Sequence, residues 1–140
     1  MRLTLLLICI TLFANLAHGQ NQLNIDISGL RNQTGTLNVL IYDNGNGFPD
    51  DIQLAMKKII VDASSPTIRI DDLSFGQYAI AILHDENKDL AMNFNWLGLP
   101  KEGFGFSNNK PILAGPPNFD AAAITFKQHQ QNVNIKLKYL

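Results

Sequence analysis

The stretch that decides the fold is "IDDLSFGQYAIAILH", residues 70–84. Its second half places Tyr78, Ile80 and Ile82 at every second position. Successive side chains of a β-strand point to opposite faces, so this spacing puts the three residues on one face. The segment therefore predicts a strand that packs one face against a hydrophobic core.

Six further segments have the character of strands, four of them with clear alternation of apolar residues and two with a weaker pattern. The four are residues 23–28, 36–42, 66–71 and 132–139, and the two are 56–63 and 122–127. Clusters of Gly, Asn and Pro separate these short segments, which favours an antiparallel sandwich. Little of the chain is expected to be helical: one or two turns near 48–58 and one turn near 118–123.

A second pattern lies at the start of the predicted strand, residues 77–84. Leu73, Gly76 and Tyr78 have a spacing that resembles the tyrosine corner of immunoglobulin-like sandwiches, where a phenolic hydroxyl bonds back to nearby backbone. Related spacing occurs in transthyretin-like sandwiches. We expect an all-β, antiparallel immunoglobulin-like or transthyretin-like sandwich of about seven strands, with a long loop near residues 84–121.

The first 19 residues are predicted to form a signal peptide. Arg2 supplies a positive start, and the apolar run 3–16 is shorter than the roughly 20 residues that a membrane span needs. Ala17 and Gly19 are the small residues that a signal peptidase requires at a cleavage site. We therefore expect a secreted or periplasmic protein.

Cleavage after Gly19 leaves residues 20–140 as a single β-sandwich domain. It also removes Cys9, the one cysteine of the chain, which excludes disulfides and thiol catalysis from the mature protein. The formal net charge of the whole chain is −1 and no basic cluster occurs, so nothing indicates nucleic-acid binding. No second apolar stretch is long enough to predict a transmembrane segment after cleavage.

A polar run, "HDENKD" (84–89), follows the central strand. Asp85, Asn87 and Asp89 have the spacing that lets a tight loop direct three oxygens at one hard cation such as Ca²⁺. Asp43 follows the strand of residues 36–42 and would add an oxygen if the two loops share one end of the sandwich. The alternative is a solvated turn whose Asp and Asn side chains bond their own backbone.

His84 invites a catalytic interpretation as well. Its position is in phase with Ile80 and Ile82, which predicts a histidine at the edge of the core with its ring nitrogens hydrogen-bonded. A hydrolase would need His84 to meet Ser74 or Ser107, and no nucleophile-elbow pattern supports such a meeting. We therefore predict no catalytic residue.

The expected long loop is rich in aromatic residues, and loops of this length tend to be functional or packed by their own side chains. In the favoured interpretation Phe94, Trp96, Phe104 and Phe106 form a small core of their own, with Trp96 buried. In the alternative, Trp96 is an exposed stacking surface in a ligand site. The candidate residues of that ligand site are His84, Trp96, Lys101, Glu102, Asn108 and Asn109.

Three blocks carry a family resemblance: "LSFGQYAIAILHDENKD", "GLPKEGFGFSNN" and "GPPNFDAAAITF", in this order. They resemble a family of small exported bacterial proteins known as domain of unknown function 2141. The resemblance implies an exported single β domain and implies no activity. One departure is visible, because Leu90 and Ala91 follow Asp89 where members of the family often continue with Asn or Gly, and this weakens the cation hypothesis.

Three functions from different classes remain open on the sequence. The first is a non-enzymatic exported binding or envelope-associated module that presents the loop of residues 84–109 to a protein or small ligand. The second is a structural domain stabilised by Ca²⁺, the one cofactor considered. The third is a hydrolase.

Overall fold

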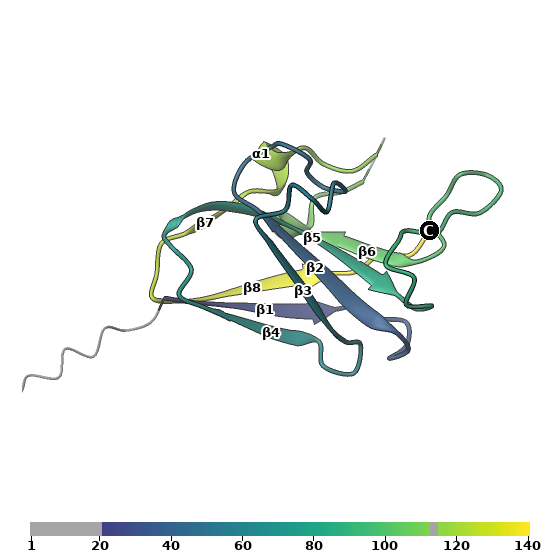
Figure 1. Ribbon diagram of the computed structural model, residues 1–140, viewed down its shortest axis with the longest axis horizontal. Helices are drawn as coiled ribbons and strands as arrows, with labels where there is room; N and C mark the ends of the chain where they lie inside the picture. The colour runs from purple at the N-terminus through teal and green to yellow at the C-terminus, as the bar shows by residue number, and fades with distance from the viewer. Residues whose placement is uncertain (1–20, 113–114) are drawn as a thin grey trace, which may run out of the picture.

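The computed structural model describes residues 21–112 and 115–140 (Figure 1). The expected signal peptide, residues 1–19, lies outside the described part of the chain. Within that part, no helix is both long and apolar enough to cross a membrane.

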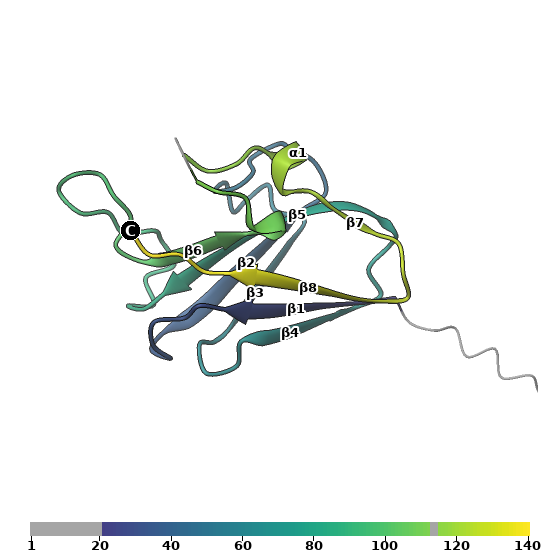
Figure 2. The ribbon, with the colours of Figure 1, turned by 180° about the vertical axis from the view of Figure 1, so that it is seen from behind.

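The described chain forms two β-sheets that lie face to face in a sandwich-like arrangement, seen from two sides in Figures 1 and 2. The first sheet has the order β4 (Thr67–Asp71), β1 (Gln22–Ser28) and β8 (Gln130–Lys136). The second has the order β3 (Lys57–Asp62), β2 (Thr36–Tyr42), β5 (Gly76–Asp85) and β6 (Gly103–Phe106), and β7 (Ile124–Phe126) also pairs with β5. The described residues also form two short helices, η1 (Ser107–Asn109) and α1 (Phe119–Ala122).

All seven segments predicted as strands form strands, but two details of the prediction were wrong. The sandwich is not purely antiparallel, because β1 runs parallel to β8, with Gln22 opposite Gln130. The expected loop of residues 84–121 also contains an additional strand, β6, with the sequence Gly-Phe-Gly-Phe. Glycine is unfavourable in strands, so this segment gave no strand signal.

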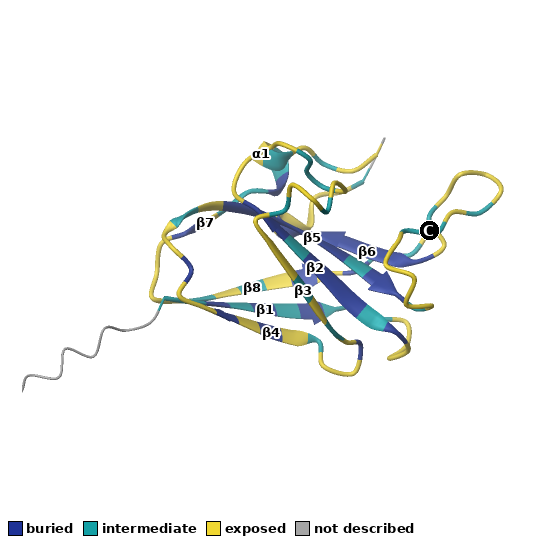
Figure 3. Cartoon of the chain, in the orientation of Figure 1, coloured by how far each residue is buried: buried dark blue, intermediate teal, exposed yellow. Residues whose placement is uncertain are grey.

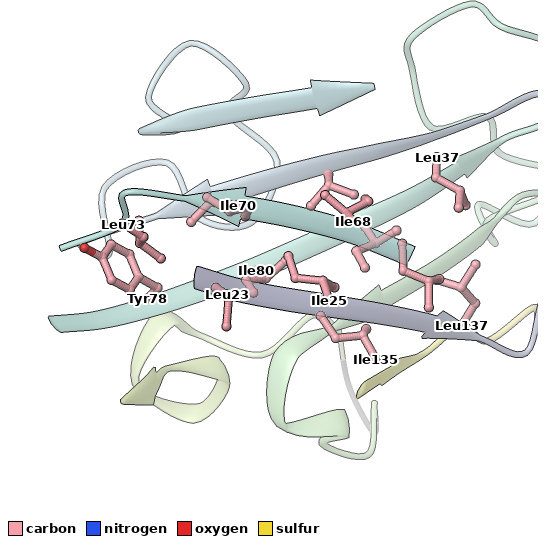
Figure 4. Close-up of a cluster of buried hydrophobic side chains, with 14 of the residues drawn as sticks. Leu23, Ile25, Leu37, Ile68, Ile70, Leu73, Tyr78, Ile80, Ile135 and Leu137 are labelled. Atoms are coloured by element: carbon pink, nitrogen blue, oxygen red, sulfur yellow. The ribbon is translucent and has the colours of Figure 1, made fainter. Parts of the chain in front are cut away.

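The main core lies between the two sheets and is built from the alternating residues of the strands. Figure 4 shows side chains from both sheets meeting there; those labelled are Leu23, Ile25, Leu37, Ile68, Ile70, Leu73, Tyr78, Ile80, Ile135 and Leu137. At one end of this core the Tyr78 hydroxyl donates a hydrogen bond to the Ser74 carbonyl (2.8 Å). The aromatic ring is thereby fixed over the start of β5.

A second apolar cluster covers the opposite face of β5, which explains why this strand is apolar on both faces. Ala79 and Ala81 point to that side and are buried against Phe104, Phe106 and Ala122. Burial of β5 on both faces is visible as the mostly dark blue middle of this strand in Figure 3. The loop described below begins at the end of this strand.

The chain after β8 leaves the first sheet and pairs with β6 of the second. The backbone N–H groups of Phe104 and Lys138 each donate to the carbonyl of the other, at 3.0 and 2.8 Å. This crossing requires glycine, because a Cβ at Gly103 would lie 2.4 Å from the ring of Tyr139.

Candidate functional site

The loop between β5 and β6 reaches beyond the strand ends and lies next to the C-terminus (Figure 1, right). Its outer part, residues 93–101, folds back on itself and is called the projecting hairpin below. The backbone N–H of Asn95 donates to the Leu99 carbonyl (2.8 Å), and that of Lys101 donates to the Asn93 carbonyl (2.8 Å). These bonds give the hairpin a defined shape without support from either sheet.

Asn95 organises the tip of the projecting hairpin. Its side-chain oxygen accepts hydrogen bonds from the backbone N–H groups of Leu97 (2.9 Å) and Leu99 (3.0 Å). Its carbonyl accepts a third bond, from the N–H of Gly98 (2.9 Å). Gly98 has φ +76°, a left-handed conformation that glycine adopts without strain. The backbone donors of Leu97, Gly98 and Leu99 are thus bonded within the tip itself.

The side chains at this tip are apolar and exposed. Trp96 is 91% exposed, Leu97 60% and Phe94 58%. Phe104 and Phe106, in contrast, are buried in β6. The predicted aromatic core is therefore half correct, and the burial expected for Trp96 was wrong. The physical reason is that Trp96 lies on a hairpin that leaves the sheets, where no other part of the described chain covers it.

Asp85 anchors the start of the loop. Its side chain is fully buried at the end of β5. One carboxylate oxygen accepts from the backbone N–H of Asp89 (3.2 Å), and the other accepts from the N–H of Leu90 (2.8 Å). The side-chain amide of Asn38 on β2 donates to the second oxygen as well (3.2 Å). A buried carboxylate with these donors fixes the backbone turn that starts the loop.

Asp89 binds the loop in the same way. Its carboxylate accepts hydrogen bonds from the side chains of Asn93 (2.8 Å) and Asn87 (2.9 Å) and from the backbone N–H of Ala91 (2.9 Å). These three donors, with the Asn93 side chain the strongest, hold the pKa of Asp89 below its usual range. The carboxylate oxygens are directed at N–H groups of the loop.

The candidate metal ligands do not converge on one point. Thr36 of β2 pairs with Asp85, whereas Tyr42 at the other end of β2 pairs with Ala79, so Asp43 lies at the opposite end of the sheet from Asp85. At about 3.3 Å per residue, the two ends of β2 are about 20 Å apart. Among the described residues, no group of three or more His, Cys, Asp or Glu side chains is placed to hold a metal ion.

Glu102 closes the base of the hairpin from the other side. It is only 4% exposed. One carboxylate oxygen accepts from the backbone N–H of Glu86 (3.2 Å), and the other accepts from the backbone N–H of Asn93 (3.0 Å). One side chain thus ties the outgoing and the returning parts of the loop together.

An ion pair between Arg31 and Glu86 braces this base against the loop that follows β1. The Arg31 Nε donates to Glu86 Oε1 (3.0 Å), and Nη2 makes a second contact to Oε2. The same guanidinium donates to the Lys101 carbonyl (3.1 Å) and stacks over the Tyr139 ring at 4.7 Å. The hydrogen bond from Arg31 lowers the pKa of Glu86, and the same bond raises the pKa of Arg31.

His84 is buried and both of its ring nitrogens are engaged. Nε2 lies 2.7 Å from the Thr34 carbonyl, and Nδ1 lies 2.7 Å from the Tyr139 hydroxyl. A carbonyl only accepts, so Nε2 carries a proton. The Tyr139 hydroxyl accepts from the backbone N–H of Arg31 (3.2 Å) and is also hydrogen-bonded to Nδ1. The expected hydrogen-bonded histidine at the edge of the core is confirmed.

Neither serine considered for a hydrolase contacts His84 in the described hydrogen bonding. The Ser107 hydroxyl donates to the Ala122 carbonyl (2.5 Å) and accepts from the backbone N–H of Ile80 (2.9 Å). Ser74 precedes β5 and therefore lies at the end of the strand opposite to His84. Neither of these two serines is therefore placed for activation by this histidine.

The six candidate ligand residues divide into two separate groups. Lys101 and Glu102 lie at the base of the hairpin, near His84, and Trp96 lies at its tip. Asn108 and Asn109 follow the far end of β6 and have a structural role there. The Asn108 side chain donates to the Ala123 carbonyl (2.7 Å), and that of Asn109 donates to the Asn134 carbonyl (2.8 Å).

A hollow of about 240 Å³ lies at the base of the projecting hairpin. It is lined by Arg31, Glu86, Asn87, Asn93, Lys101 and Glu102. Sequence reasoning missed Arg31 and Tyr139, which come from distant parts of the chain. Tyr139 had a signal, because it continues the alternation of residues 132–139, whereas nothing local marked Arg31 as the partner of Glu86.

Comparisons with known proteins place the chain within one family. A family model described as "Uncharacterized protein conserved in bacteria (DUF2141)" matches residues 25–134. No curated protein matches the chain. A solved structure that is similar is the crystal structure of a DUF4876 family protein from Bacteroides thetaiotaomicron VPI-5482, at 11% identity and a TM-score of 0.36. The similarity covers 85% of this chain and 24% of that one, so the chain spans about a quarter of that protein's length.

Proposed function

This chain belongs to the DUF2141 family of uncharacterised bacterial proteins, and we propose that it is an exported, non-enzymatic module that binds another component of the cell envelope through the projecting hairpin. Export is supported by the signal-peptide pattern of residues 1–19. The observation that carries the binding proposal is Trp96, which is 91% exposed at the tip of a hydrogen-bonded hairpin. Tryptophan is among the residues that contribute most to binding energy.

The base of the hairpin supports this proposal because it fixes the tip before any partner arrives. Asp85, Asp89 and Glu102 accept between them several backbone N–H groups of the loop, and Arg31 braces it from outside. A segment that is already ordered loses little conformational entropy when it binds. These acidic side chains, which would otherwise be candidates for catalysis, hold the projecting hairpin in place.

A non-enzymatic role is favoured by the way the polar side chains are used. Both nitrogens of His84 and both carboxylate oxygens of Glu102 are hydrogen-bonded to the protein itself. Every buried side-chain nitrogen and oxygen among the described residues has such a partner. A general acid or base needs an atom that can reach a substrate, and these groups are committed to the fold.

The finer assignment of the sandwich is also a proposal. We propose an immunoglobulin-like arrangement, supported by the bond from the Tyr78 hydroxyl to the Ser74 carbonyl, which has the form of a tyrosine corner. This assignment includes one departure from a purely antiparallel sandwich. The departure is the parallel pairing of β1 with β8.

The binding proposal is tested by retention of the exported protein on isolated envelope fractions. We expect retention to fall strongly in Trp96→Ala and Leu97→Ala. The matched control is Leu54→Ala, because Leu54 is 53% exposed, close to the 60% of Leu97, and lies in the connection between β2 and β3 at the other end of the sheet. Equal retention of all three folded variants would contradict the use of the hairpin.

A further inference from the structure

We infer that the partner of the projecting hairpin is a lipid surface, with Trp96 and its apolar neighbours inserting into the interfacial layer of a bilayer. This inference rests on the proposed function and names the class of partner. Three properties of the hairpin carry it: its charge pattern, its backbone hydrogen bonding and its position at the end of the molecule.

The charge pattern divides the loop into an uncharged tip and a charged base. Residues 90–100 contain no ionisable side chain, whereas Lys88, Asp89, Lys101 and Glu102 flank them. An ionised group is costly to move into a low-dielectric medium, and an uncharged segment avoids this cost. The limits of the uncharged segment therefore define how far the hairpin can insert.

The hydrogen bonding of the tip's backbone also lowers the cost of moving the tip from water into a bilayer. The N–H groups of Leu97, Gly98 and Leu99 all donate to Asn95 within the hairpin. In a bilayer, each unbonded backbone donor costs several kcal/mol, so loops rarely enter it. The N–H groups of Leu97, Gly98 and Leu99 are already bonded, so they do not add this cost when the tip inserts.

The side chains match the chemistry of the interface between lipid and water. Tryptophan is enriched at the level of the lipid headgroups because its ring is apolar and its indole N–H is a donor. Phe94, Leu97 and Leu99 surround it with apolar surface and are each at least 43% exposed. Together they form the apolar part of an interfacial anchor.

The position of the hairpin favours a flat surface over a recess in a protein. In Figures 1 and 2 the hairpin extends beyond the other described segments at this end of the molecule. A convex tip needs a matching pocket in a protein partner, whereas a fluid bilayer adapts to it. The flanking charges have both signs, so the binding should not require anionic lipid or low salt.

The experiment mixes the full exported protein with vesicles of pure phosphatidylcholine. Trp96 is the one tryptophan of the chain, so its fluorescence reports directly on the tip. We expect a blue shift of the emission on adding vesicles, quenching by lipids brominated on their acyl chains, and no loss of binding between low and high salt. Co-sedimentation should fall roughly tenfold in Trp96→Ala, and Leu54→Ala should bind as the parent does.

Three other outcomes of these experiments would overturn the lipid-surface inference. Absence of vesicle binding, together with Trp96-dependent retention on envelope fractions that protease treatment abolishes, would overturn the lipid surface and keep the proposed function with a protein partner. Absence of both kinds of binding would overturn both. Binding that needs anionic lipid and disappears in salt would also overturn the inference, because charge and not the apolar tip would then carry it.

Discussion

The carboxylate of Glu102 accepts the backbone N–H of Asn93, nine residues earlier in the chain, at a distance of 3.0 Å. Its second oxygen accepts the backbone N–H of Glu86. Both donors come from the outgoing arm of the loop, and Glu102 stands at the end of the returning arm. A single buried side chain therefore determines where the projecting hairpin begins.

Glu102→Gln should loosen the hairpin. The amide NH₂ of the glutamine would face one of the two backbone donors, leaving a buried N–H unbonded at a cost of about 1–3 kcal/mol. The free energy of unfolding and the exchange rate of the Asn93 amide hydrogen measure this. Lys101→Gln, a change at the exposed neighbouring side chain, should alter stability by less than about 0.5 kcal/mol. Similar values for both variants would contradict the role of Glu102.

Trp96→Ala should leave the free energy of unfolding within about 0.5 kcal/mol of the parent, because the ring is exposed. Phe104→Ala, at a buried position in β6, should cost about 3–5 kcal/mol. Native Trp96 emission should be at long wavelength and should change little on denaturation. A blue native emission in buffer without lipid would show that the ring is covered.

The ion pair of Glu86 with Arg31 should make the free energy of unfolding depend on pH in the acid range. The pKa of Glu86 is lowered in the folded protein from its ordinary 4.5. Its contribution is therefore complete above pH 4.5 and is lost as the pH falls from there through the lowered pKa. Because Arg31 is half exposed, the contribution should be below about 1 kcal/mol. Urea unfolding of the parent and of Glu86→Gln should differ above pH 4.5 and converge below it.

Chelators and Ca²⁺ should leave the melting temperature unchanged. The carboxylates of Asp85 and Asp89 are already bonded to N–H groups of the loop, and Asp43 lies at the other end of the sheet. A scan with EDTA and a scan with Ca²⁺ should coincide with the untreated protein. A rise of about 4 °C with Ca²⁺ would correspond to about 1 kcal/mol of binding and would restore the cation hypothesis.

Gly35→Ala should be far more damaging than Gly98→Ala, although both glycines have positive φ values, +82° and +76°. A Cβ at Gly35 would lie 2.1 Å from the backbone oxygen of Asp85, whereas one at Gly98 meets no atom within 4 Å. Gly98→Ala should cost only the left-handed conformation, about 1–2 kcal/mol. Thermal melts of the two variants give the comparison, and equal losses would mean that the contact with Asp85 can relax.

The strands and the position of His84 could be predicted from sequence because both follow from a period of two within a single segment. The strand β6 could not, since Gly103 is needed for a contact with Tyr139, which lies far along the chain. The exposure of Trp96 could not be predicted from the sequence either. Four aromatic residues in one loop look alike in sequence, and only the three-dimensional path of the chain separates the two in β6 from the two on the hairpin.

The parallel pairing of β1 with β8 has a consequence for the order in which the molecule assembles. The first and last strands of the fold are neighbours, with residues 108 positions apart in register, such as Asn24 and Asn132. Contacts between such distant parts of a chain slow folding, because a long loop must close before they form. The first sheet is complete only once the final strand is in place, and the segment that follows it then closes over β6. Until that moment β1 has one neighbour, β4, and its other edge is open to pairing with another chain.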